Sequence, residues 1–169
     1  KPLYKRIIQE TADWLIDCMQ SESGGFYATL NADSGGMEGG YYLWEQKDCK
    51  SLLSDKAYIS LKNYFNLDEA PNFECKFHLY VKNEPIYNDI IAEAKCALLT
   101  ARKQRLPPAC DTKILCDWNA LTIKALYQAG KCLGEKRYTA VADHSLDYIC
   151  KSFFKLQFFG PVHFHLLNA

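Results

Sequence analysis

The sequence lacks a net charge and lacks any long hydrophobic run. Its 20 Lys and Arg residues balance its 20 Asp and Glu residues. A balanced chain carries no basic surface of the kind that binds nucleic acid or an anionic membrane. No apolar run is long enough to cross a bilayer, and no apolar segment of a signal peptide follows residues 1–6. We therefore expect no nucleic-acid partner and no membrane partner.

Several motifs that would indicate an activity are also missing. The sequence has no Gly-x-Gly-x-x-Gly motif, no phosphate-binding loop and no nucleophile elbow of a serine hydrolase. Its 8 cysteines never form Cys-x-x-Cys, the spacing of zinc knuckles and of thioredoxin-type redox pairs. His163 and His165 alternate on an expected strand, but no third ligand accompanies them. We expect no cofactor and no metal ion.

The cysteines suit a reducing compartment. Cys18, Cys96, Cys132 and Cys150 fall within helical patterns, where cysteine behaves as a small buried hydrophobe. Disulfide frameworks are typical of small, loop-rich extracellular scaffolds, and this chain is longer and helical in pattern. We therefore predict reduced and mostly buried thiols in a cytoplasmic protein.

Apolar residues recur at helical spacing over most of the chain. This spacing predicts helices over residues 2–20, 45–53, 55–65, 85–106, 117–132 and 135–154. We expect Asp55 to cap the third of them, Gly134 to end the fifth, and residues 158–165 to form a strand. The length suits one domain, and no low-complexity linker divides it. The sequence therefore predicts a mainly α protein with a single domain over residues 1–169.

A glycine-rich stretch over residues 24–44 interrupts the helical pattern. It predicts a β-hairpin near residues 25–44, in which two aromatic-rich strands flank a loop that contains Asp33, Ser34 and Glu38. Binding and catalytic residues concentrate in loops that a rigid scaffold displays. Two carboxylates in one loop could act as an acid–base pair on a sugar. The alternative is that Asp33 only accepts hydrogen bonds from the backbone of its own loop.

Other candidate site residues are aromatic or polar. Trp44 and Trp118 could provide flat indole faces on which a sugar ring stacks, and core packing is the alternative for both. Lys113 could stabilise an oxyanion or an enolate, as an epimerase requires. Asn119 could orient a hydroxyl group. The alternatives at this end of the chain are helix capping by Asp117 and a surface ion pair formed by Lys113.

Several motifs occur in an order that resembles a known family. They are the hairpin, residues 72–76, Arg102-x-x-Arg105, the run from Asp111 to Leu121, and Ala129-Gly130 before Leu133-Gly134. From about Tyr4 to Phe154 the chain resembles the helical region of the YyaL-like, spermatogenesis-associated proteins that contain a thioredoxin domain.

The resemblance implies both a fold and a larger protein. In that family a thioredoxin-like domain lies upstream of an (α/α)-barrel similar to N-acylglucosamine 2-epimerase and the six-hairpin glycosidases. The chain would then be part of an (α/α)6 toroid of helical hairpins, with the β-hairpin as an insertion and without the thioredoxin-like domain. Such a partial barrel is expected to self-associate through its uncovered apolar faces and to be inactive alone.

Two function hypotheses follow. The first is a carbohydrate-active barrel, epimerase-like or glycosidase-like, that acts on a saccharide ligand. Its predicted catalytic residues are Asp33, Glu38 and Lys113. Its predicted substrate-binding residues are Trp44, Glu74, Asp111, Trp118 and Asn119. The second hypothesis is a non-catalytic helical scaffold or interaction module whose partner is its own thioredoxin-like domain.

Overall fold

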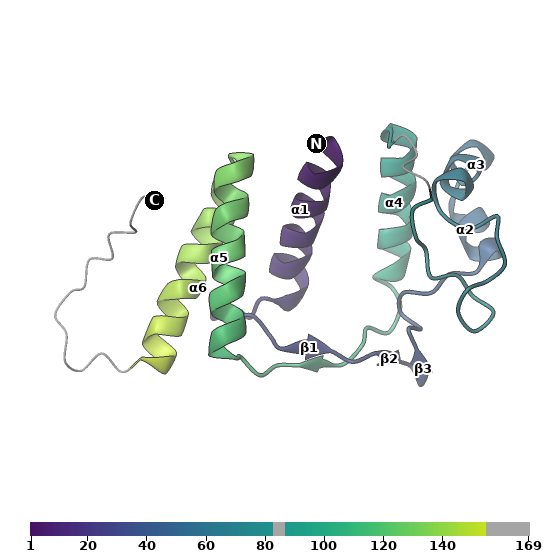
Figure 1. Cartoon of the computed structure of the whole chain (residues 1–169). Helices are drawn as coiled ribbons and strands as arrows, with labels where there is room; N and C mark the ends of the chain where they lie inside the picture. Colours follow the sequence, from purple (N-terminus) through teal and green to yellow (C-terminus); the bar gives the residue numbers. More distant parts are fainter. Residues whose placement is uncertain (83–86, 155–169) are drawn as a thin grey trace. The chain divides into compact units, whose positions relative to one another are not determined.

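A computed structural model describes residues 1–82 and 87–154 of the chain (Figure 1). The described residues divide into two compact units, with residues 1–29 and 110–154 in unit 1 and residues 30–82 and 87–109 in unit 2. Helices account for 57% of the described residues. The prediction of a mainly α protein is therefore confirmed, whereas the single domain and the (α/α)6 toroid stay predictions.

Unit 1 contains three α-helices and one π-helical turn among its described residues. Helix α1 (Pro2–Trp14) carries its proline in the first turn, where the missing N–H costs nothing, and runs into the π-helical turn η1 (Leu15–Met19). Helices α5 (Cys116–Leu133) and α6 (Lys136–Phe153) lie side by side as a helical hairpin (Figure 1).

Two glycines make the α5–α6 hairpin possible. Gly134 ends α5 in the left-handed conformation at φ +73°, which confirms the predicted stop. A Cβ on Gly130 would lie only 2.6 Å from Cγ2 of Thr139 on α6. The helices can therefore approach this closely only because position 130 has no side chain.

Polar contacts attach the start of α6 to α1 and η1. The buried Tyr138 hydroxyl donates a hydrogen bond of 3.0 Å to the Asp13 carboxylate. Burial and this carboxylate raise the pKa of Tyr138 to about 12. Arg137 forms ion pairs with Asp13 at 3.2 Å and with Asp17 at 3.0 Å.

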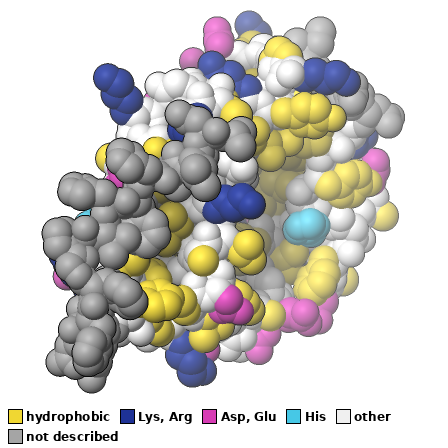
Figure 2. Space-filling model, turned by 60° about the vertical axis from the view of Figure 1, so that its left-hand side comes forward, with side chains coloured by type: hydrophobic (Ala, Val, Ile, Leu, Met, Phe, Trp, Pro, Cys, Tyr) yellow, Lys and Arg dark blue, Asp and Glu magenta, His cyan; other side chains and the backbone are white. Residues whose placement is uncertain are grey.

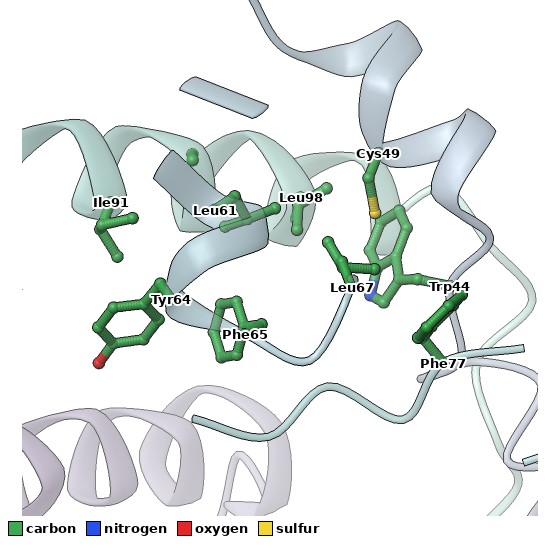
Figure 3. Packing of buried hydrophobic residues seen from close by; sticks show 10 residues of the cluster. Trp44, Cys49, Leu61, Tyr64, Phe65, Leu67, Phe77, Ile91 and Leu98 are labelled. Carbon is green, nitrogen blue, oxygen red and sulfur yellow. The ribbon is translucent and has the colours of Figure 1, made fainter. Parts of the chain in front are cut away.

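Unit 2 is organised around an apolar core. Helices α2 (Gln46–Leu52), α3 (Asp55–Tyr64) and α4 (Asp89–Arg102) contact one another around it. The core residues, shown in part in Figure 3, are Trp44, Cys49, Leu61, Tyr64, Phe65, Leu67, Phe77, Ile91, Ala94 and Leu98. Burial raises the pKa of the Cys49 thiol to about 11, so this thiol is protonated at neutral pH.

The starts of α3 and α4 differ from the sequence prediction. Ser54, rather than Asp55, caps α3, because its hydroxyl accepts the Ala57 N–H at 3.3 Å. Helix α4 begins at Asp89, later than predicted, because the Asn88 side chain accepts the Ile91 N–H at 3.1 Å. Residues 83–86 lie outside the described part of the chain.

The β-hairpin is much shorter than predicted. Strands β2 (Asp33–Ser34) and β3 (Met37–Glu38) are antiparallel and are joined by Gly35 and Gly36, whose φ angles are +61° and +78°. Positive φ at both central residues is typical of a tight two-residue turn. The flanking aromatic segments pair elsewhere. Trp44 forms a bridge with Phe77, and β1 (Thr29–Leu30) pairs with β4 (Cys110–Asp111).

The prediction of mostly buried thiols is wrong. All 8 cysteines are free, but only Cys49 is buried, whereas Cys18, Cys96 and Cys132 are exposed and Cys150 is half-buried. Their position within helices therefore does not make these four thiols buried. The predicted strand over residues 158–165, with its two histidines, lies outside the described residues.

Two substitutions on α3 test the core of unit 2. Leu61 has no exposed surface, whereas Ile59 on the same helix is 58% exposed. Leu61→Ala should lower the free energy of unfolding by about 2–5 kcal/mol, because it leaves a cavity in a packed core. Ile59→Ala should change it by no more than about 0.5 kcal/mol. Urea denaturation of both variants measures the difference, and equal losses would contradict the described packing.

Candidate functional site

Asn119 connects two distant segments of unit 1. It lies in the first turn of α5 and is only 1% exposed. Its side-chain oxygen accepts the Phe26 N–H at 2.7 Å, and its nitrogen donates to the Phe26 carbonyl at 3.0 Å and the Leu115 carbonyl at 2.9 Å. The amide group is therefore fully occupied by backbone partners.

Trp118, the neighbour of Asn119, is exposed rather than buried. The residue is 52% exposed, which is unusual for a tryptophan. Its backbone is well held, because its N–H donates to the Asp117 carboxylate at 2.9 Å and its carbonyl accepts from the Thr122 hydroxyl at 2.9 Å. The structure therefore presents an exposed aromatic ring from a fixed stretch of helix.

Asp111 and Lys113 precede α5 and contact each other. The Lys113 ammonium lies 2.9 Å from the Asp111 carboxylate, and the Lys113 N–H donates to the same carboxylate at 3.1 Å. The hydrogen bonds from Lys113 keep the pKa of Asp111 below its usual range. Asp111 is thus ionised at neutral pH and can accept hydrogen bonds. An exposed pair of this kind contributes little to stability.

Asp33 and Glu38 lie opposite each other in the short hairpin. They are direct partners in the β2–β3 register, and both are exposed. Side chains of directly opposed residues share one face of a hairpin, with Cβ atoms about 4.5–5.5 Å apart. The Asp33 N–H donates to the Asn31 side chain at 3.2 Å. The two carboxylates are therefore neighbours on an accessible surface.

Trp44 packs inside unit 2. It is 4% exposed and belongs to the apolar core, where Figure 3 shows its indole beside Cys49 and Leu67. The Arg105 guanidinium lies 4.0 Å from its ring centre and donates to the Leu43 carbonyl at 2.6 Å. The indole face is covered by protein in this arrangement.

Glu74 occupies a tight turn in unit 2. Glu74 and Cys75 have φ angles of +42° and +63°, the left-handed region that favours glycine, within the bridge between Phe73 and Lys76. An open hollow of about 480 Å³ lies nearby; its lining residues are Glu45, Gln46, Lys47, Glu69, Pro71, Cys75 and Phe77. Glu74 itself does not line this hollow.

The predicted site residues fall into both units. Asp111, Lys113, Trp118 and Asn119 belong to unit 1, whereas Asp33, Glu38, Trp44 and Glu74 belong to unit 2. Within the units, the structure brings Asp33 to Glu38 and Asp111 to Lys113. Over residues 1–82 and 87–154, no cluster of three or more His, Cys, Asp or Glu residues could hold a metal ion.

Sequence reasoning gave no role to the arginines at the end of α4. Arg105 donates to the carbonyl of Tyr41, 64 residues distant in sequence, at 3.0 Å. It also donates to the carbonyl of Leu43, 62 residues distant. The Arg102-x-x-Arg105 spacing would place both side chains on one face of a continuous helix, but α4 ends at Arg102. The partners could not be found from the sequence, because they are backbone carbonyls of an irregular segment.

Comparisons with known proteins give distant similarity. No family model matches the chain. An uncharacterized protein of Caenorhabditis elegans, B0495.5, is 27% identical over 77% of this chain and 23% of its own length. Spermatogenesis-associated protein 20 is 24% identical in Homo sapiens and 25% identical in Mus musculus, over 89% of this chain and 24% of each relative. The chain therefore spans about a quarter of the length of the relatives that it matches.

None of the helices in the described residues is both long and apolar enough to cross a membrane.

Two substitutions within α5 test the structural role of Asn119. Asn119→Ala should lower the free energy of unfolding by about 2 kcal/mol or more, because it leaves the buried Phe26 N–H and C=O without partners. Thr122→Ala, which removes one exposed hydrogen bond, is the control and should cost no more than about 0.5 kcal/mol. Chemical denaturation measures both values. An Asn119→Ala variant as stable as the control would contradict this role.

Proposed function

We propose that unit 1 binds a saccharide, with Trp118 as the platform on which a sugar ring stacks. The observation that carries the proposal is the indole of Trp118, which is 52% exposed on a backbone fixed by its buried neighbour Asn119. A rigid exposed indole offers a large apolar face at a low cost in conformational entropy.

The polar neighbours of Trp118 suit the same ligand. A sugar combines an apolar C–H face with hydroxyl groups, and buried hydroxyl groups need hydrogen-bond partners. Asp117 lies next to Trp118 in α5, and the ionised Asp111 with Lys113 lies in the segment that leads into this helix. Carboxylates can accept hydrogen bonds from hydroxyl groups, and the lysine can donate to ring or hydroxyl oxygens.

The catalytic part of the proposal assigns proton transfer to Asp33 and Glu38. Asp33 and Glu38 are directly opposed across β2 and β3. Acid–base chemistry on a sugar uses such a pair of carboxylates. Lys113 is proposed to stabilise negative charge that develops on the substrate. Each of these roles would suit an epimerase-like or glycosidase-like activity in a larger protein.

The proposed larger protein follows from the distant similarity to spermatogenesis-associated protein 20, of which the chain spans 24%. We propose that it belongs to the YyaL-like family, that the helices here are part of an (α/α)6 toroid, and that a thioredoxin-like domain accompanies it in the cytoplasm. The helical hairpin of α5 and α6 is the unit from which such a toroid is built.

A second candidate function is an interaction module. Helix α1 exposes Leu3, Tyr4, Ile7 and Ile8, which recur at the spacing of one helix face. Figure 2 shows hydrophobic side chains at several places on the visible surface. Exposed apolar patches mark protein interaction sites, and the rest of a longer protein, its thioredoxin-like domain included, would provide the partner.

Two tryptophan variants test the saccharide proposal. A saccharide should be found in a screen by calorimetry against the 169-residue chain, and Trp118→Ala should weaken its affinity about 30-fold, as loss of an anchoring tryptophan does. Trp14→Ala is the matched control, because Trp14 is also exposed in unit 1, at 39%, and should change the affinity less than about twofold.

Two results would contradict the saccharide proposal. One is that no saccharide binds in a broad screen. The other is that both tryptophan variants weaken binding equally. If sedimentation velocity then shows self-association that Ile7→Glu abolishes, the interaction module becomes the better account of unit 1.

A further inference from the structure

Two arginines at the end of α4 have different surroundings. Arg105 is used inside unit 2, because it donates to the carbonyls of Tyr41 and Leu43 and lies over the Trp44 ring. Burial lowers the pKa of Arg105, and the nearby Arg102 charge acts in the same direction. The contact with the Tyr41 carbonyl also holds the backbone that carries Tyr41 and Tyr42.

Arg102 is held by these two tyrosines. The carbon of its guanidinium lies 5.5 Å from the ring centre of Tyr41 and 5.3 Å from that of Tyr42. The two rings meet edge to face at 5.0 Å. Aromatic faces attract a cation, so the rings restrict where the guanidinium can lie. The half-buried side chain is thus oriented by contacts that use none of its N–H groups.

The donors of Arg102 have no partner in the part of the chain that the structure describes. Its Nε is buried without a hydrogen bond, and the side chain as a whole is half-buried. Buried polar groups are nearly always hydrogen-bonded, so an orphaned donor calls for an explanation. The charge of Asp48 favours the protonated form of the neighbouring Arg105.

We propose that Arg102 binds an oxyanion, a carboxylate or phosphate group, at the last turn of α4 beside Tyr41 and Tyr42. A guanidinium presents N–H groups in a fixed fork that matches two oxygens of either group. Arg105, three residues further along the chain, adds a second positive charge whose interaction with Arg102 is felt in the pKa of Arg105. The site lies in unit 2 and does not depend on the saccharide site proposed for unit 1.

Inorganic phosphate is the probe that tests the site. Phosphate is titrated into the 169-residue chain at constant ionic strength, and the backbone amide signals of Tyr41 and Tyr42 are followed by NMR. We expect saturable shifts at both amides. Arg102→Gln should weaken the affinity about tenfold or more, because charge-assisted hydrogen bonds are lost. Lys103→Gln, which removes the same charge from the exposed neighbouring position, should weaken it less than about twofold.

Two further measurements, an acetate titration and an Arg102→Lys variant, complete the test. Acetate in place of phosphate shows which oxyanion the fork prefers. Arg102→Lys keeps the charge but loses the fork, so it should also weaken binding and serves if Arg102→Gln fails to fold by circular dichroism. The proposal is overturned if neither anion gives saturable shifts, if Arg102→Lys binds as well as the unchanged chain, or if Lys103→Gln weakens binding as much as Arg102→Gln.

Discussion

The hydrogen bonds between Asn119 and Phe26 are the constraint on which unit 1 depends. Unit 1 is assembled from two chain segments that unit 2 separates in sequence, and these residues are 93 positions apart. One buried amide group satisfies both backbone groups of Phe26, which would otherwise lose their partners in the core. Gln20, which donates to the buried Ser145 at 3.1 Å, supports the same junction between segments.

Unit 2 uses the same physical device with a different side chain. The planar guanidinium of Arg105 satisfies carbonyls of an irregular segment and stacks on the core residue Trp44. In each unit a planar polar group fixes a segment without regular secondary structure. Such a segment lacks the regular hydrogen bonds of a helix or sheet, so its backbone N–H and C=O groups need other partners. The exposed Trp118 and the half-buried Arg102 at the end of α4 are then presented from fixed backbone, as binding residues need to be.

The sequence predicted what local patterns determine. The helical periodicity predicted a mainly α protein, and Gly134 marked the end of α5, because only local backbone conformation decides that stop. The predicted length of the hairpin was wrong, because Trp44 pairs with the distant Phe77 and not with the other side of the hairpin. Composition could not tell that Trp44 is buried and Trp118 exposed, since both indoles suit either position. The roles of Arg102 and Arg105 depend on partners at least sixty residues away.

Native-state hydrogen exchange of the Phe26 amide tests the central role of Asn119 most directly. An amide whose hydrogen bond closes the core should exchange only when unit 1 unfolds. The account predicts that the Phe26 amide is as well protected as that of Ile123, a buried residue within α5, and that Asn119→Ala removes its protection. A Phe26 amide that exchanges at the rate of an unprotected loop, while Ile123 stays protected, would contradict it.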